Sequence, residues 1–485
     1  MIRSIRHGAL FTGIALLTGC ASYSGIAPEA RQLDGAALER QAAAIPTVTW
    51  PKTDWWQDFH DPVLSGLIGQ ALADSPNLQA SVARLNRAKA VSGLAESALW
   101  PQVNASLSSN RQRFSEHGLI PPPYAGTRQN VNELQFGGQW EIDFFGKNRA
   151  GLEAAIGELR ANEADHQAAR QMLATNVARR YYNLAQQIAQ RALAEQRKQQ
   201  RSDLAALVER RFKAGLDTRV ELESAQGTIP ESARDIAALD AQIAVSRHAL
   251  AVLTGQAPNA VDGIAPALPQ ASPLALPAAL PANLLGHRAD VAAARWRVES
   301  ALHGLEYTQA MFYPNINLRF FTGFSAIGFD HWLDAGSRVP GIGIAVSLPI
   351  FDAGRLRSLY HLSAGFVDSS VSTYNATLLD ALRDVADQLS TLQALETQLA
   401  HQKSAEASAQ RSYDLALQRF QADISDRLNV LDVETKLIAQ QQISIDLQAR
   451  RIDTRILLIH ALGGGFTEDP APAVVPVAAS EPVTN

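Results

Sequence analysis

Four stretches of the chain alternate apolar side chains with polar or small ones at a period of two. In one of them Leu134 and Phe136 are separated by Gln135, and Trp140 follows Gln139. That period is typical of a β-strand with one apolar and one polar face. We therefore predict two strand pairs, each joined by a loop rich in Gly and Pro. The expected strands lie at about 102–115, 130–144, 315–326 and 338–350.

Two other segments predict very long helices. From Gly146 to about Phe212, and from Ala353 to about Phe420, there is no proline and almost no glycine. At 1.5 Å per residue each helix would extend roughly 100 Å, so it needs partner helices along its length, as in a coiled coil. The last expected helix has apolar residues seven apart, which predicts a left-handed supercoil. These are Leu431, Ile438, Ile445, Ile452 and Ile459.

The same order of elements occurs twice, which indicates an internal duplication. Trp100–Asn104 (WPQVN) matches Tyr313–Asn317 (YPNIN), and Arg211–Ala214 (RFKA) matches Arg419–Ala422 (RFQA) at a slightly shorter offset. Each half thus predicts a helix, two strands, a long helix, a turn and a further helix. Pro230 lies inside the helix expected after the first turn and should kink or split it.

Four strands of ten to fourteen residues are long enough to cross an outer membrane when tilted, but too few to close a barrel. An open sheet edge cannot face lipid, because its backbone groups would have no partners. Several chains must therefore share one barrel if these strands span the membrane; two copies give about eight strands and three about twelve. A pair of soluble hairpins is the alternative.

The N-terminus resembles a lipoprotein signal. Arg3 and Arg6 precede the apolar stretch Ala9–Leu17, and Cys20 follows. Cys20 is the only cysteine, so no intramolecular disulfide can form. We expect Cys20 to be lipidated rather than to be a chance free thiol.

The chain divides by these signals into six parts. They are a signal peptide (1–19), an extended lipidated segment (20–60), a first structural repeat (61–255), a linker (256–285), a second structural repeat (286–463) and a disordered tail (464–485).

Composition excludes several classes of function. The net charge is -5 and the basic residues are dispersed, so no nucleic-acid partner is expected. The sequence contains no run of eighteen apolar residues, so no transmembrane helix is predicted for the mature chain. Eleven histidines have no metal-ligand spacing, and no phosphate loop or nucleophile motif appears. We therefore expect no catalytic residues, no metal and no cofactor, and assign the chain as not an enzyme.

Several short motifs together resemble one family. Asp54–Trp56 (DWW) and Ser75–Leu78 (SPNL) resemble the start of mature outer-membrane factors of the NodT type. Arg288–Val291 (RADV) resembles the Arg-Pro-Asp-Val motif of that family, with Ala289 replacing the proline. Ser347–Arg355 (SLPIFDAGR) is the strongest local signature. From about Trp50 to Gly463 the chain is similar to TolC-like outer-membrane factors, the exit ducts of RND-type tripartite efflux pumps.

This resemblance implies a fold that is mainly α with a membrane β-barrel part. A homotrimer would share a twelve-stranded barrel in the outer membrane and extend a helical tunnel into the periplasm. A periplasmic adaptor (membrane fusion) protein and an inner-membrane RND-type transporter would dock at the far end. Cys20 would carry a covalent diacylglycerol and an N-acyl chain, anchoring the protein in the outer membrane. The duct would conduct small molecules passively.

The resemblance also places a periplasmic gate near the second turn. It falls on Leu428 and Asp432, which are four residues apart and share a helix face. Three copies would form an apolar constriction and a ring of negative charge. Asp426 and Arg427 would hold the turn closed through salt bridges. Asp432 could instead be a carboxylate favoured by the helix dipole. In the first half, Asp217 and Thr218 are expected to cap the helix.

Two other functions stay open at this point. One is an exit duct for proteins in a type I secretion system. The other is a lipid-anchored periplasmic coiled coil with a structural role, which explains the helices and Cys20 but not the two strand pairs. The sequence does not identify the cargo, the partner transporter or the gating trigger.

Overall fold

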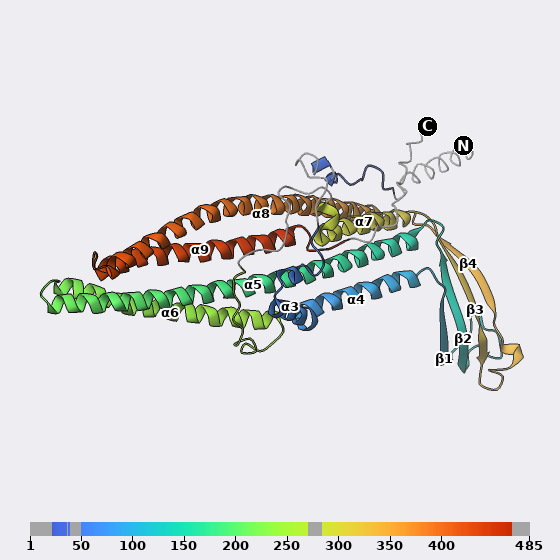
Figure 1. Cartoon of the computed structure of the whole chain (residues 1–485). Helices are drawn as coiled ribbons and strands as arrows, with labels where there is room; N and C mark the ends of the chain where they lie inside the picture. Colours follow the sequence, from blue (N-terminus) through green and yellow to red (C-terminus); the bar gives the residue numbers. More distant parts are fainter. Residues whose placement is uncertain (1–21, 36, 39–49, 270–283, 468–485) are drawn as a thin grey trace. The chain divides into compact units, whose positions relative to one another are not determined.

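The computed structural model describes residues 22–35, 37–38, 50–269 and 284–467. Cys20, the signal peptide and most of the C-terminal tail lie outside these residues. The main elements of the described chain (Figure 1) are α3 (Pro62–Asp74), α4 (Pro76–Ser97), β1 (Gln102–Arg113), β2 (Arg128–Ile142), α5 (Lys147–Lys213), α6 (Arg219–Leu253), α7 (Ala289–Ala310), β3 (Asn315–Ile327), β4 (Gly341–Ser347), α8 (Arg355–Gln421) and α9 (Arg427–Ala461). Short 3-10 helices include η2 (Trp55–Phe59) and η3 (Leu284–His287).

Element lengths confirm the internal duplication. Helices α4 and α7 both have 22 residues, α5 and α8 both have 67, and α6 and α9 both have 35. One offset relates the starts of α4, β1 and β2 to those of α7, β3 and β4. A second offset, shorter by five, relates α5 and α6 to α8 and α9. The change in offset therefore occurs between the second strand of each half and the long helix that follows it. Both offsets found in the sequence are reproduced in the structure.

The chain folds into two compact units. The sheet unit contains residues up to 32, 84–162 and 293–375; the helical unit contains 33–83, 163–292 and 376–485. Each unit takes segments from both halves of the duplicated sequence. The two halves are therefore intertwined rather than stacked as separate domains.

The sheet unit contains one antiparallel sheet with strand order β1-β2-β3-β4. The four expected strands are confirmed, with different ends. Strand β1 stops at Arg113 rather than at 115, and β4 spans Gly341–Ser347 rather than 338–350. Proline has no backbone N–H for a ladder hydrogen bond, so Pro340 and Pro349 account for both ends of β4.

The strand register gives this sheet one apolar and one polar face. Val103 pairs with Gly138, Gly138 with Phe320, and Phe320 with Ile342, so one face continues across all strands. Its apolar residues are Val103, Leu107, Leu134, Phe136, Trp140, Ile142, Ile316, Leu318, Phe320, Phe324, Ile342, Ile344 and Val346. The opposite face contains Glu133, Glu141 and Arg319 among Asn, Gln, Ser and Gly, and its larger apolar residues are Val131, Phe321 and Ile327. Ile342 and Ile344 are 77% and 70% exposed, so the apolar face is uncovered within one chain.

The core of the helical unit forms around η2 and α3. Trp55, Leu64 and Ile68 are buried against apolar residues of α5, α6 and α9. Asp61 caps α3 by accepting hydrogen bonds from the backbone N–H groups of Val63 and Leu64, each 3.0 Å long. The Tyr181 hydroxyl donates to the same carboxylate at 2.7 Å. Burial and the Asp61 charge both raise the pKa of Tyr181.

Helix α6 differs from two expectations. It continues through Pro230 without a break from Arg219 to Leu253, so the predicted split is wrong. Tertiary contacts on both sides of the proline, such as buried Ala225 and Ile236, support the helix. An 18-residue window of α6 also has a mean hydropathy of 1.3, apolar and long enough to cross a membrane by composition. Because α6 forms ion pairs with α5, for example Asp240 with Arg191, we assign it to the helical wall.

Part of the expected linker is packed rather than extended. Val261 is buried in the core of the helical unit, beside the partly buried Ile264. The Arg247 guanidinium donates to the Ile264 carbonyl oxygen at 3.1 Å. Residues 270–283 of this segment lie outside the described chain.

The Arg-Ala-Asp-Val sequence has a structural role in the helical unit. The Arg288 side chain is only 8% exposed and donates to both Asp290 carboxylate oxygens, at 3.0 and 2.6 Å. It also reaches Asp384 of α8 at 3.5 Å and the Ala461 carbonyl oxygen of α9 at 3.4 Å. Burial opposes the charge on Asp290, but Arg288 outweighs it and lowers the pKa of that carboxyl. This buried cation therefore joins α7, α8 and α9.

Candidate functional site

The two helical hairpins turn in the same way. After α5, Leu216 N–H donates to the Arg211 carbonyl oxygen, and after α8, Ile424 N–H donates to the Arg419 carbonyl oxygen, both at 2.9 Å. The residue before each donor is left-handed: Gly215 has φ +76° and Asp423 has φ +57°. Glycine adopts this conformation without strain, and Asp tolerates it better than most residues. The backbone therefore places equivalent side chains equivalently at both tips.

The first turn has a complete helix cap. The Thr218 hydroxyl accepts from Glu221 N–H while the Glu221 carboxylate accepts from Thr218 N–H, forming a capping box. Asp217 pairs instead with Arg211 at 2.9 Å. Thr218 thus acts as the predicted cap, whereas Asp217 holds the end of α5.

The second turn joins α9 to both α8 and α5. Asp426 is the N-cap of α9, and its carboxylate accepts from Asn429 N–H at 3.0 Å. The Arg427 guanidinium lies 5.7 Å from the centre of the Phe420 ring on α8. It also lies 3.9 Å from the Asp203 carboxylate on α5. Arg427 therefore connects the two halves of the chain at this end.

Leu428 and Asp432 lie on the first turns of α9 with exposed side chains. Leu428 is 37% exposed. The Asp432 carboxylate is 64% exposed and pairs with Lys436 of the same helix at 2.8 Å. The N-cap of α9 is Asp426 and not Asp432. Lys436 was not anticipated from the sequence, although its i, i+4 spacing from Asp432 was visible there.

Acidic groups gather around Arg427. Glu434 is partly buried, and burial raises the pKa of its carboxyl; Asp203 raises that pKa further and Arg427 opposes the shift. At the neighbouring turn, Asp217 and then Asp426 raise the pKa of Arg211. The charged groups of the two turns therefore interact with one another. Asp203 and Glu434 interact with Arg427, and Asp426 interacts with Arg211.

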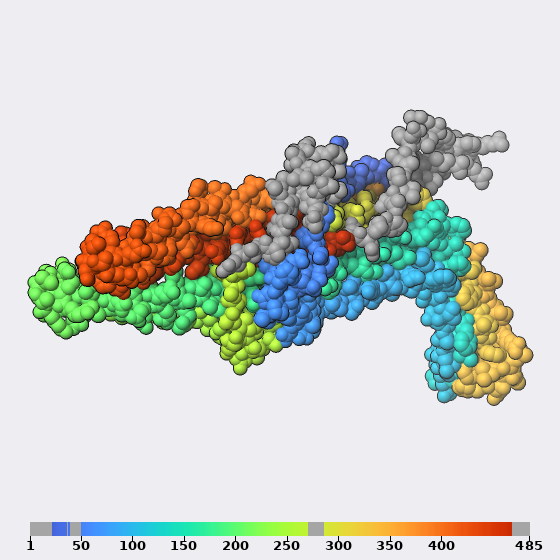
Figure 2. Space-filling view, in the orientation of Figure 1, coloured from blue at the N-terminus to red at the C-terminus, as the bar shows by residue number. Residues whose placement is uncertain are grey.

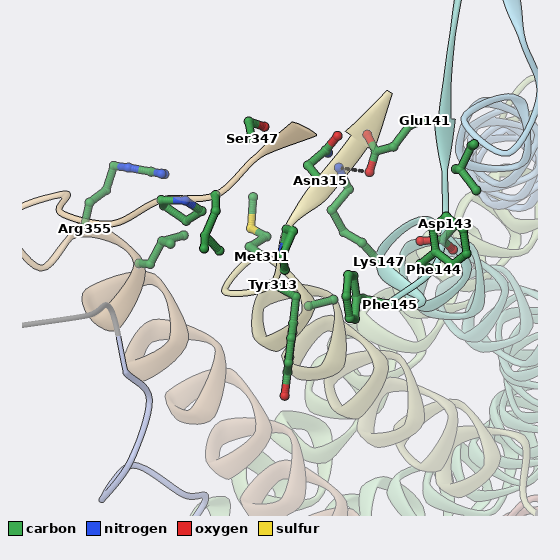
Figure 3. A pocket seen from close by; sticks show the side chains of 16 residues that line it. Glu141, Asp143, Phe144, Phe145, Lys147, Met311, Tyr313, Asn315, Ser347 and Arg355 are labelled. Atoms are coloured by element: carbon green, nitrogen blue, oxygen red, sulfur yellow. Dashed lines mark ion pairs between the residues drawn. The ribbon is translucent and has the colours of Figure 1, made fainter. Parts of the chain in front are cut away.

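A pocket of about 380 Å³ lies in the sheet unit, where strands β2, β3 and β4 meet the helices (Figure 3). Glu141 of β2 forms an ion pair with Lys147 at 2.5 Å. Asp143 has a different role, because its carboxylate accepts from the backbone N–H groups of Asn148 and Arg149 at 3.1 and 2.9 Å. It therefore holds the start of α5.

The described residues contain no cluster of three or more His, Cys, Asp or Glu side chains suited to a metal ion. The candidate functional features of the described residues are therefore the polar face of the sheet and the charged residues at the second turn.

Comparison with known proteins identifies the family. The sequence profile of the outer membrane efflux protein family matches residues 67–256 and 280–464. The chain is 30% identical over 475 residues to the multidrug resistance outer membrane protein MdtQ of Escherichia coli O157:H7, covering 94% of this chain and 98% of the relative. It is 36% identical over 350 residues to the fusaric acid resistance protein FusA of Burkholderia cepacia, covering 71% and 66%.

Solved structures share the fold. The outer membrane protein VceC of Vibrio cholerae superposes with a TM-score of 0.79 at 33% identity, covering 86% of this chain and all of VceC. The CmeC outer membrane channel of Campylobacter jejuni gives a TM-score of 0.80 at 21% identity, covering 91% and 94%.

The chain belongs to the outer membrane efflux protein family. It is an outer-membrane channel component of an efflux system, with the mainly helical fold and four-stranded sheet of that class.

Proposed function

We propose that three copies of the chain assemble into one duct. The observation that carries this proposal is the sheet, which has an uncovered apolar face, a polar face and two edge strands, β1 and β4. In lipid an open edge leaves backbone groups without partners. Pairing β4 of one copy with β1 of the next closes the sheet, and three copies give about twelve strands. The apolar face then meets lipid and the polar face lines the passage.

Exposed apolar side chains support the same head-to-tail arrangement. In the sheet unit, Leu362 and Phe366 of α8 are 54% and 58% exposed, and Val91 and Leu94 of α4 are 50% and 72% exposed. These are two different surfaces of one chain. A contact between unlike surfaces forms a closed ring when the rotation closes.

The proposed cargo is small molecules that pass through the duct without being bound or modified. The names of the relatives MdtQ and FusA, which refer to multidrug and fusaric acid resistance, support this cargo class. A periplasmic adaptor and an inner-membrane RND-type transporter are the proposed partners at the hairpin tips. A type I secretion partner would instead require protein export.

The proposed periplasmic gate is formed by Leu428, Asp432, Arg427 and Asp426. Leu428 and Asp432 would point into the passage from three copies, giving an apolar ring and a charged ring. The contacts of Arg427 with Asp203 and Phe420 support a role in holding α9 in the closed position. Lys436 partly compensates each Asp432, so the ring selects cations less strongly than three free carboxylates would.

Lipidation of Cys20 is the last part of the proposal. The signal-like N-terminus and the absence of a second cysteine in the sequence support it. A diacylglycerol and an N-acyl chain together give firm anchoring, because one chain alone binds membranes only marginally.

Single-channel conductance in planar bilayers tests the proposed gate. We expect small, cation-preferring conductance for the wild type and a larger conductance for Asp432→Ala. Ser224→Ala is the matched control, because Ser224 occupies the position equivalent to Asp432 on α6, and it should leave the conductance unchanged.

Equal conductance of Asp432→Ala and wild type would move the gate away from this ring. Absence of channels from folded, lipidated protein would overturn the shared duct itself.

A further inference from the structure

The segment that follows Cys20 lies along α8 within the sheet unit. We call residues 22–31 the N-terminal strap (blue in Figures 1 and 2). Three side chains of one helix hold its backbone. The Arg357 guanidinium donates to the carbonyl oxygens of Ser22 and Ser24 at 3.0 and 3.1 Å.

Asp368 and Asn375 hold the rest of the strap. One Asp368 carboxylate oxygen accepts from the backbone N–H groups of Glu29 and Ala30, both at 2.8 Å. The Asn375 side-chain amide donates to the Arg31 carbonyl oxygen at 2.9 Å. Each of these bonds ends on strap backbone, so the three side chains bind the main chain of the strap rather than its side chains. Hydrogen bonds to a charged carboxylate or guanidinium are stronger than neutral ones.

The spacing of the three side chains matches the strap. Positions 357, 368 and 375 are separated by about three and about two whole turns of an α-helix, so they share one face. From 357 to 375 the helix rises about 27 Å. The nine steps from Ser22 to Arg31 extend to about 30 Å. The strap therefore runs parallel to α8, with its first residues at the end of α8 that follows β4. Near its start it makes one turn, in which Ile26 N–H donates to the Tyr23 carbonyl oxygen at 3.2 Å and Gly25 has φ +80°.

An aromatic contact fixes that first end. The Tyr23 ring packs against Phe312 and Tyr360, with centroids 5.3 and 5.2 Å apart. Its hydroxyl accepts from the Gln309 amide at 3.1 Å and lies 3.4 Å from the Tyr313 hydroxyl. Tyr313 comes two residues before β3, so the strap begins beside the base of the sheet.

We propose that Arg357, Asp368 and Asn375 form a docking site for the strap backbone that fixes the acylated N-terminus at the base of the sheet. The inference rests on the lipidation of Cys20 proposed above. Ser22 is two residues from Cys20, a reach of at most about 7 Å. The lipid is then held beside the strands at one depth, instead of moving on a free tether.

Amide hydrogen exchange of the full-length lipidated protein in nanodiscs tests the docking site. We expect Asp368→Ala to accelerate exchange at Glu29 and Ala30 at least about tenfold, since both amides lose a charged acceptor. Arg357→Ala should increase the mobility of the Ser22–Ser24 end. Asp380→Ala is the matched control, because Asp380 lies on α8 but pairs with Arg383, and it should leave strap exchange unchanged.

Unchanged exchange at Glu29 and Ala30 in Asp368→Ala, or equal acceleration in Asp380→Ala, would overturn the docking site. Conductance and the mass of the N-terminal peptide are measured on the same samples. Normal conductance with unchanged exchange would then reject the docking site alone, whereas a Cys20 peptide without acyl mass would reject the lipidation on which it rests.

Discussion

Helices α5 and α8 have the same length and equivalent positions in the duplicated sequence, but different surroundings. In the helical unit, α5 packs against α3 and forms ion pairs with two further helices. Arg201 pairs with Glu231 of α6 at 3.3 Å, and Arg179 pairs with Asp453 of α9 at 2.6 Å. Helix α8 contacts α9, for example through Gln402 and the Gln440 carbonyl oxygen at 2.9 Å. Helices α8 and α9 lie side by side in Figures 1 and 2.

The two helices also differ in the side chains that they expose. Helix α8 exposes Leu362, Phe366 and Leu379, each at least 50% exposed. The equivalent positions of α5 are occupied by Ala154, Glu158 and Gln171.

The difference does not extend along the whole helix. Leu415, nearer the second turn, is 60% exposed and has an apolar counterpart on α5, Leu207. The two duplicated helices thus have equal length, but only the first part of α8 has these exposed apolar side chains. The proposed assembly interface therefore differs from the equivalent part of α5 in its side chains rather than in its backbone.

The largest expected effect comes from removing the cation that joins α7, α8 and α9. Arg288→Ala removes a buried guanidinium with its bonds to Asp290, Asp384 and the Ala461 carbonyl oxygen. Because the Asp290 and Asp384 side chains are each 42% exposed and can be hydrated, we expect a loss of about 2 kcal/mol rather than the cost of a fully buried charge. Thermal unfolding of the detergent-solubilised protein should show a lower midpoint than the wild type. Arg191→Ala, which removes a more exposed pair with Asp240, is the control and should have a small effect. Similar midpoints for both variants would contradict the role of Arg288.

Exchanging side chains between the two long helices tests whether the exposed apolar residues of α8 form the proposed interface. Phe366→Glu installs the residue that α5 has at the equivalent position, Glu158. Each copy loses about 1.5–3 kcal/mol of apolar burial and gains a charge at the proposed interface. We expect loss of the trimer in native mass spectrometry. Adding the reciprocal change Glu158→Phe to the Phe366→Glu protein is the control, and it should not restore the trimer. A stable trimer of the Phe366→Glu protein would place the interface elsewhere.

The fold could be predicted from the sequence to a large extent, because its signals are periodic. Alternation in 130–144, the proline-free helices and the two offsets of the internal repeat correspond to observed elements. The continuity of α6 through Pro230 could not be predicted, since tertiary packing outweighs a local propensity. The packing of Val261 was also missed, because Pro and Ala around it resemble an extended linker.

The first turn has a capping box and the second a single capping carboxylate, and the next smaller effect is expected from removing each cap. Thr218→Ala removes one half of a capping box, and Asp426→Ala removes a single acceptor; each should cost about 1 kcal/mol locally. Amide exchange at Glu221 and Asn429, respectively, should accelerate about fivefold. Asn429 is affected only by the second variant and Glu221 only by the first, so the variants control each other. If one variant accelerated amide exchange at both Glu221 and Asn429, the two turns would open together rather than independently.

The smallest effect concerns pH at the second turn. The folded pKa of Glu434 is raised above its ordinary value of 4.5, mainly by burial. Its ionised form therefore destabilises the fold at neutral pH, and the penalty disappears as pH falls through the raised pKa. Glu434→Gln should be slightly more stable than wild type at pH 7, with no difference below about pH 4. A stability difference that is constant with pH would exclude this charge as its cause.

The candidate gate was less predictable than the fold. The positions of Leu428 and Asp432 came from family resemblance, and their role stays a prediction. The partners of Arg427 could not be found from sequence, because Asp203 belongs to the other half of the duplicated chain and is brought close only by the packing of α5 beside α9. The cap function of Asp426 was detectable, since Asp before a helix is a frequent N-cap.

The two unpaired edges of the four-stranded sheet also have a genetic consequence. In the proposed trimer every subunit supplies one edge to each neighbour, so one chain with a damaged β1 or β4 leaves the whole ring open. When damaged and normal chains are made in equal amounts and mix freely, only about one assembly in eight contains three normal subunits. Alleles that disrupt these strands while sparing the α8 surface should therefore be dominant, whereas alleles that prevent association should be recessive.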